Sequence, residues 1–513
     1  MAKVNLDALI QREDFEVEEV INSGKKKETI SIEDIRSDSF FFSNLRKPDF
    51  QRETNEWDGA KVAELIRSFI AGDLIPAVIL WRSTGGYLFV IDGSHRLSAL
   101  AAWVNDDYGD NAASKLFYDG ILPDEQLAIA QETRKQVEKL VGSYKDYKLA
   151  LTHPDKVKPE IVRNAKNLGA LAIQLQWVEG DARKAESSFF KINQQAAPID
   201  KTELKLLEDR RRPNSIAARA IIRSGKGHKY WSLFSEEQQS LIQDLASEIN
   251  NILFSPRLQT PIKTLDLPIA GKLYSAQTLP LIVDMISIVV PPGDGADDTT
   301  GEKTVAVLKS VRRVAYLLNS NHASSLGLHP AVYFYSQEGR HKTASFLALT
   351  DLVARLVKHG KINDFVKVRK PFEAFLLEYD YLIQQINRKY RTAQASYPHI
   401  SEFLEAVIDG MSSNSDSQAI LGRILLLPEF GHLSLQRPAN KRGQAGKKFD
   451  SDAKSAVYLR EVLKTAPVCK ICDGYIHRNS ISIDHVERRS AGGSSGAENG
   501  QLTHPYCNTG FKA

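Results

Sequence analysis

Three cysteines and a histidine near the end of the chain have the spacing of a metal site. Cys469 and Cys472 form one C-x-x-C pair, and His504 and Cys507 repeat that spacing. All 3 cysteines of the chain lie in this stretch, and a clustered, odd number favours metal binding over a set of disulfides. A redox dithiol would need a thioredoxin-like strand and helix, which the neighbouring residues do not supply. We therefore expect a Cys₃His zinc site, which is structural because four protein ligands leave no open position.

A carboxylate and an imidazole stand side by side between these two pairs. The alternating segment Ile481–Ile483 predicts a strand, and Asp484 and His485 follow it directly. An imidazole has a pKa near neutral and suits a general base, while a carboxylate suits a hard cation such as Mg²⁺ or Mn²⁺. The pattern is completed by a Gly/Ser-rich loop at 491–496, then by Asn499 and by Asn508 next to the last cysteine.

The joint pattern of zinc pairs, Asp-His, Gly-Gly, Asn and Cys-Asn resembles an HNH nuclease, the ββα-metal fold, over about the last 46 residues. The resemblance implies that His485 is the general base and that Asp484 binds a catalytic Mg²⁺ or Mn²⁺ ion. It also implies that Asn499 tethers the loop and helps to orient the base, and that Asn508 contributes to the metal site. We expect phosphate contacts from Arg488, Arg489 and Lys512 and from the basic linker residues Lys441, Arg442, Lys447 and Lys448.

Two other interpretations of this segment stay open. The module could be a zinc knuckle that binds nucleic acid without cutting it, although such a knuckle needs no Asp-His pair. His477 could be an additional metal ligand, but we interpret it as an ordinary strand residue.

A second candidate site lies near the N-terminus, at the turn Asp92-Gly93-Ser94-His95-Arg96. The turn follows an apolar run at 87–91 and precedes helical spacing at 97–104, and the free N–H groups of such a helix start can bind anions. Arg96 could pair with phosphate oxygens, and Gly93 permits close backbone approach. Asp92 could hold a metal or position a water. The alternative is that Asp92 and Arg96 form a structural ion pair that holds the turn.

This turn resembles the D-G-Q-Q-R-L motif of the ParB/sulfiredoxin-like domain in GmrSD-type restriction enzymes and SspE-type defence proteins, although Ser94-His95 replaces the usual Gln-Gln. Matches to the opening F-Q-R…W and the later F-x-x-I-N extend the resemblance over roughly residues 39 to 210. It implies binding of a nucleoside triphosphate, which could be GTP, ATP or CTP, and control of a nuclease, with or without NTPase activity. The residues expected at this site are Gln51, Arg52, Asp92, Gly93, His95, Arg96 and Asn193.

The elements around these motifs predict an α+β multidomain protein. A helix at 61–70 and strands at 77–81, 87–91 and 171–178 form a ParB-like α/β unit, whereas residues from 201 to about 427 read mostly as helices. We expect the following domains: an N-terminal extension (1–38), the sensor or NTP domain (39–210), a helical domain (211–430), a basic linker (431–454) and a zinc-stabilised ββα-metal HNH module (455–513).

Composition limits the function classes. The 513 residues are 42% hydrophobic and 25% charged, which is typical of a globular protein with a large core and leaves no apolar run long enough to span a bilayer. We expect a cytoplasmic protein with no membrane partner. Net charge is +4, yet the last 83 residues carry 13 Lys/Arg against 7 Asp/Glu. The excess indicates an anionic partner at this end.

Together these patterns predict a metal-dependent HNH endonuclease that nicks or cuts DNA, as a restriction or anti-phage defence effector regulated by sensing of a nucleotide or a DNA modification. The alternative is a ParB-like nucleotide switch that binds DNA through a non-cleaving zinc module. The sequence leaves open whether the protein forms a homo-oligomer.

Overall fold

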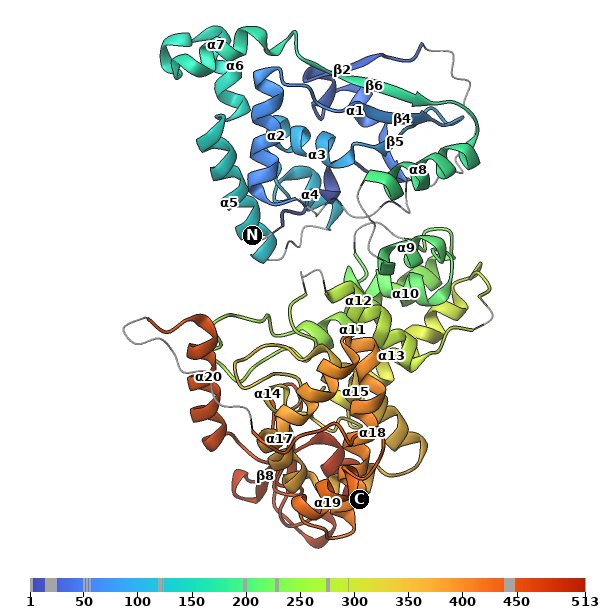
Figure 1. Ribbon diagram of the computed structural model, residues 1–513, viewed down its shortest axis with the longest axis vertical. Helices are drawn as coiled ribbons and strands as arrows, with labels where there is room; N and C mark the ends of the chain where they lie inside the picture. Colours follow the sequence, from blue (N-terminus) through green and yellow to red (C-terminus); the bar gives the residue numbers. More distant parts are fainter. Residues whose placement is uncertain are drawn as a thin grey trace. The chain divides into compact units, whose positions relative to one another are not determined.

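The computed structural model contains two compact units (Figure 1). It describes residues 3–13, 25–48, 51, 54, 57–118, 122, 124–196, 201–226, 230–273, 277–293, 295–437 and 448–512. One unit comprises residues 1–210 with 226–230, and the other comprises 211–225 with 231–513. Among the described residues, no helix combines the length and the apolar character that a membrane crossing requires.

The first unit is built on a mixed sheet. Within its described part, six strands pair in the order β1-β3-β5-β4-β6-β2. Their bounds are β1 (Arg12–Glu13), β2 (Thr29–Ser31), β3 (Leu45–Pro48), β4 (Val78–Arg82), β5 (Leu88–Asp92) and β6 (Ala172–Val178). β4 and β5 form the expected antiparallel hairpin, while β6 runs parallel to β4. Residues that the sequence places in an N-terminal extension contribute β1 and β2.

Helices cover both faces of this sheet because its central strands alternate apolar side chains between two cores. Leu80 and Val90 pack into the core that contains α2 and α3, whereas Trp81 and Phe89 pack with Phe189 of α8 on the opposite face. The helices of this unit are α1 (Phe40–Ser43), α2 (Gly59–Ala71), α3 (Ser94–Asn105), α4 (Ala112–Phe117), α5 (Asp124–Leu140), α6 (Tyr144–Thr152), α7 (Pro159–Leu168), α8 (Ala182–Ala196) and α9 (Lys201–Glu208).

The second unit is mostly helical and includes the C-terminal module. Its helices are α10 (Pro213–Ile222), α11 (Glu236–Phe254), α12 (Thr278–Val289), α13 (Glu302–Leu318), α14 (Pro330–Tyr333), α15 (Thr343–Lys358), α16 (Ile362–Lys367), α17 (Arg369–Tyr390), α18 (Ala393–Ser412), α19 (Ser417–Ile424) and α20 (Ser451–Val462). A small antiparallel hairpin, β7 (Ser482–His485) and β8 (Gly500–Thr503), follows. The predicted fold class, with an α/β N-terminal sheet, a helical middle and a small C-terminal zinc module, is therefore confirmed.

The final helix of the C-terminal module is short. The chain forms a single π-helical turn at Cys507–Phe511, so the module's own elements bury little apolar surface. His477 is not in a strand, contrary to our expectation: it follows the isolated bridge between Val468 and Tyr475. The strand expectation failed because pairing in this segment is limited to that single bridge, and His477 lies in the irregular stretch between Tyr475 and the turn at 478–479.

Candidate metal centre and nuclease site

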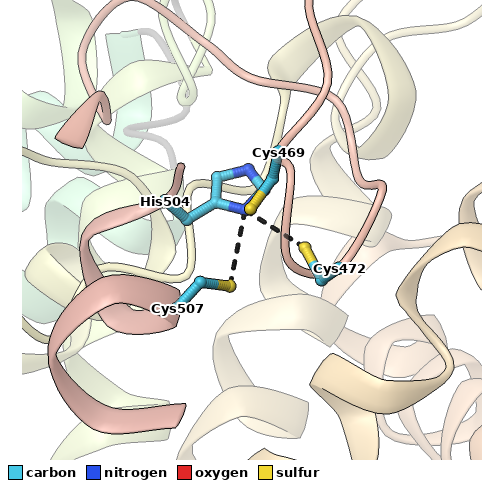
Figure 2. A group of neighbouring side chains, drawn as sticks. All are labelled: Cys469, Cys472, His504 and Cys507. Atoms are coloured by element: carbon cyan, nitrogen blue, oxygen red, sulfur yellow. Dashed lines mark hydrogen bonds between the residues drawn. The ribbon is translucent and has the colours of Figure 1, made fainter. Parts of the chain in front are cut away.

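The four expected zinc ligands converge on one point. Cys469, Cys472, His504 and Cys507 are all buried, and one potential ligand atom from each lies within 4.8 Å of all the others (Figure 2). The Nδ1 atom of His504 is 3.4 Å from the Sγ atom of Cys472 and 3.8 Å from that of Cys507. Three sulfurs and one nitrogen at such separations fit a tetrahedral zinc ion.

The His504 ring is held in the orientation that a metal ligand needs. Its Nε2 atom lies 3.0 Å from the carbonyl oxygen of Tyr475, so that nitrogen carries the proton and Nδ1 keeps its lone pair for the metal. The thiols of Cys472 and Cys507 donate hydrogen bonds to Cys469 and hold the pKa of the Cys469 thiol well below its ordinary value. A thiolate is thus favoured among the sulfurs, as metal binding requires.

Each ligand pair is positioned by a tight turn. The backbone N–H of Cys469 donates to the carbonyl of Gly474 at 2.8 Å, and Asp473 closes the loop with a left-handed φ of 56°. His504 and Cys507 lie one helical turn apart, and the N–H of Asn508 donates to the His504 carbonyl. The spacing seen in the sequence therefore corresponds to two local turns that face each other.

Helix α17 holds the zinc loop through a buried ion pair that the sequence analysis missed. Arg369 and Glu373 are joined by an Nε–Oε1 bond of 2.7 Å, with side chains 0% and 2% exposed. Glu373 also accepts the N–H of Tyr475 at 2.8 Å, and Arg369 donates to the carbonyls of Leu326 and Gly327. We call these two residues the α17 ion pair. They could have been noticed as charged residues at i, i+4 spacing, but nothing in the sequence predicts their partners.

Further contacts join the loop at 323–327 to the module. Ser325 shares a hydrogen bond of 2.9 Å with Ser480, and its carbonyl accepts the N–H of Tyr506. Gly327 lies so close to the zinc site that a Cβ atom there would be 2.5 Å from Cδ2 of His504. The zinc centre is therefore embedded in the helical unit.

His477 contacts the helical unit as well. Its Nδ1 atom lies 3.2 Å from Oδ1 of Asn319, and its ring packs edge-on against His329. Burial lowers the pKa of His477 to about 4, so the ring is neutral near pH 7. His477 does not belong to the cluster of potential metal ligands. This agrees with our interpretation that it is not a zinc ligand.

The hairpin places Asp484 in a polar setting. Asp484 pairs across the two strands with Gln501, whose Nε2 atom donates to Oδ2 of Asp484 at 2.8 Å. Lys512 forms an ion pair with the same oxygen at 2.5 Å. Burial opposes ionisation of Asp484, but the hydrogen bonds from Lys512 and Gln501 outweigh it, and the pKa of the carboxyl lies below its usual value. Asp484 is thus a carboxylate near neutral pH.

The other expected catalytic residues lie around the same hairpin. His485 ends β7 and is partly exposed. Asn508 donates from Nδ2 to Oγ of Ser482 and to the carbonyl of Ile483. Its amide oxygen, Oδ1, is therefore the atom that could bind a cation. Asn499 donates to the carbonyls of Glu487 and Ser494 and accepts the N–H of Glu487. These bonds connect Glu487, just after β7, to Ser494 inside the Gly/Ser-rich loop.

The candidate phosphate contacts are distributed over the surface of the module. Arg488 and Arg489 are exposed, and Arg488 donates from Nη2 to the carbonyl of Lys512. The ammonium group of Lys512 forms an ion pair with Asp484 and is largely shielded from solvent. Lys448 is exposed. The other linker residues that we expected, Lys441, Arg442 and Lys447, lie outside the described residues.

In the first unit, the N-terminal turn has the expected strand-turn-helix form. Gly93 has a φ of 98°, and a Cβ there would meet Val78 at 2.8 Å, so only glycine fits this position. Arg96 pairs with Asp92 at 2.7 Å and donates to the carbonyl of Ala77. The ion pair foreseen as the alternative thus forms, and it uses one Arg96 nitrogen, Nη2.

The remaining candidate residues of this turn lie close together where they are described. Gln51 donates to Oγ of Ser94, and its Oε1 atom is buried without a hydrogen-bond partner among the residues that the structure describes. The ring of His95 stacks on Trp57 at a centroid distance of 5.7 Å. Arg52 and the side chain of Asn193 lie outside the described residues.

Comparison with known families gives a match for two segments of the chain. Residues 29–207 match the GmrSD restriction endonuclease N-terminal domain, and residues 469–511 match the HNH endonuclease. A comparison with curated proteins gave no match, and neither did one with solved structures. The chain therefore contains a segment similar to the GmrSD restriction endonuclease N-terminal domain and, near its C-terminus, a segment similar to the HNH endonuclease.

Proposed function

We propose that this protein is a metal-dependent DNA endonuclease of the restriction or anti-phage defence type, whose C-terminal module cuts or nicks phosphodiester bonds. The observation that carries the proposal is the position of Asp484 and His485 at the end of β7, in a module whose Cys₃His cluster is buried and complete. A nucleic-acid-binding zinc knuckle would not need this pair.

Each residue of the site would have a separate role in phosphodiester hydrolysis. His485 takes the proton from the attacking water, which suits an imidazole that reaches solvent. Asp484, a carboxylate at neutral pH, and Asn508, through its amide oxygen, would hold a Mg²⁺ or Mn²⁺ ion, whose donor preference is oxygen. When bound, such an ion stabilises the charge that develops on the phosphate and the leaving oxygen. Asn499 keeps the loop after β7 in place, and Arg488 and Arg489 bind neighbouring phosphates.

We infer a sensor role for the first unit. The turn at Asp92–Arg96 would bind a nucleoside triphosphate or report a DNA modification. The Oε1 atom of Gln51 supports this role: it is buried and has no hydrogen-bond partner within the described part of the chain, and a buried polar atom without a partner is costly unless a ligand satisfies it. NTP turnover tests hydrolysis: Asp92→Ala should abolish it, and absence of turnover in the unmodified protein would exclude NTPase activity.

A second candidate function is favoured by one observation. Lys512 occupies Asp484 in the structure, as it would in a DNA-binding protein whose zinc module no longer cuts. Plasmid cleavage separates the two functions. The endonuclease should relax or linearise plasmid DNA with Mg²⁺ or Mn²⁺, in a panel of modified and unmodified DNA with and without each nucleotide. DNA binding without cleavage under all these conditions would favour the second function.

A further inference from the structure

The last described residue of the chain, Lys512, reaches back to the hairpin. Its Nζ atom lies 2.5 Å from Oδ2 of Asp484 and 2.8 Å from the carbonyl oxygen of His485. The Arg488 side chain holds the backbone of Lys512 from the other side, with an Nη2–O distance of 2.7 Å. The tail is therefore fixed in place at both its main chain and its side chain.

Two oxygens, one from a carboxylate and one from a backbone carbonyl, are the donors that a hard divalent cation also uses. An ammonium group that lies against both satisfies their negative charge and competes with a metal for them. The ion pair is sheltered from water, with side chains 24% exposed for Lys512 and 9% for Asp484. Solvent and salt therefore screen it less than a surface pair.

We propose that Lys512 is a built-in cation that closes the catalytic metal site, and that it must leave Asp484 before a divalent ion binds there. This inference rests on the proposed function of Asp484 as a metal ligand. Gln501 stays on Oδ2 of Asp484 and keeps the carboxylate oriented while Lys512 moves away.

After it leaves Asp484, the ammonium group of Lys512 would bind a phosphate oxygen of the DNA. The carboxylate that it leaves belongs to the site that receives the scissile phosphate, so the freed Nζ can bind a phosphate oxygen nearby. Lys512 would then link the two substrates of the module: it opposes metal binding in the free protein and supports DNA binding once the metal is present.

Metal affinity tests the first half of the inference without any measurement of cleavage. The full-length, zinc-loaded protein is titrated with Mn²⁺ in the absence of DNA, and free Mn²⁺ is followed by electron paramagnetic resonance. Lys512→Met should tighten Mn²⁺ binding by about fivefold, the size of a partly sheltered ion pair. Lys512→Arg keeps the charge and should stay near the unmodified protein.

Two matched variants make the result interpretable. Lys464→Met removes the same charge from a pair with Glu461 on α20 and should leave Mn²⁺ affinity within about twofold, because separated surface charges are screened. Asp484→Ala should abolish this binding. Equal affinities for Lys512→Met and Lys464→Met, or weaker binding by Lys512→Met, would overturn the inference alone. Unchanged binding by Asp484→Ala would instead refute the metal-ligand role in the proposed function.

DNA affinity tests the second half. His485→Ala protein, which should not cut, is titrated with a DNA duplex over a range of salt concentrations, with and without Mn²⁺. Loss of Lys512 should reduce the slope of log K against log salt by about 0.9, one phosphate contact, and only when Mn²⁺ is present. The same reduction without Mn²⁺, or none with it, would show that Lys512 does not move from the carboxylate to DNA.

Discussion

Neutralising Glu373 should loosen the zinc centre, although this residue belongs to α17 and not to the zinc module. Glu373 receives three hydrogen bonds in a dry setting: from Nε of Arg369 at 2.7 Å, from the hydroxyl of Tyr333 at 3.0 Å and from the N–H of Tyr475 in the zinc loop at 2.8 Å. Glu373→Gln keeps the size of the side chain but removes the charge and replaces one acceptor by a donor. Arg369 is then buried without its counter-charge.

The expected cost is large because the pair is almost completely buried. Breaking a buried ion pair costs about 3–5 kcal/mol, and at about 1.4 kcal/mol per factor of ten the lower figure favours loop opening on the order of 100-fold. Tyr333→Phe removes only one hydrogen bond and should cost about 1 kcal/mol. Loss of the charge of the pair should therefore destabilise the zinc loop more than loss of any one hydrogen bond.

Zinc transfer to a chromophoric chelator measures this opening directly. Glu373→Gln should release zinc much faster than the unmodified protein. Lys370→Met is a close control: Lys370 is the next residue after Arg369 and also pairs with the zinc loop, at Asp473, but this pair is 70% and 53% exposed. Its loss should cost less than about 1 kcal/mol. If both variants release zinc at similar rates, burial of the α17 ion pair does not stabilise the centre.

Two further predictions follow from close packing and from a lowered pKa. Gly327→Ala should accelerate zinc release in the same chelator assay, because φ is +59° and the new Cβ would overlap the His504 ring; release at the unmodified rate would contradict the packing. Burial opposes ionisation of Asp298, but hydrogen bonds from Thr304 and from neighbouring backbone N–H groups hold its pKa below the ordinary value of an aspartate. Its stabilisation is therefore complete above the unfolded pKa and is lost as pH falls through the folded pKa. Asp298→Asn should remove this acid-dependent loss in urea unfolding measured below about pH 4, and an unchanged pH profile would contradict it.

Local patterns predicted the Cys₃His cluster and a strand before the Asp-His pair because these features depend on residues close in sequence. The C-x-x-C and H-x-x-C spacings each form one turn, and the predicted strand at Ile481–Ile483 overlaps the first half of β7, which continues through Asp484 and His485. The same holds for the N-terminal turn, where Gly93 must be a glycine for steric reasons.

Long-range partners could not be predicted in this way. The amphipathic spacing of α17 shows which face is buried, but not that Arg369 would be fully enclosed and that Glu373 would bind the zinc loop about a hundred residues later. Likewise, Lys512 looked like a free phosphate contact, and its pairing with Asp484 depends on how the short final turn folds back. His477 was expected in a strand, but pairing in this segment is limited to the single bridge between Val468 and Tyr475.

We propose that the C-terminal module cuts DNA with His485 as its base. The most direct measurement compares cleavage of supercoiled plasmid by the full-length protein and by His485→Ala, both with Mg²⁺ or Mn²⁺ and with equal zinc content. We predict cleavage by the unmodified protein and a loss of at least about 100-fold in His485→Ala, the contribution of a general base. Equal cleavage by the two proteins would contradict the role of His485, and no cleavage by either on any modified or unmodified DNA would contradict the endonuclease assignment.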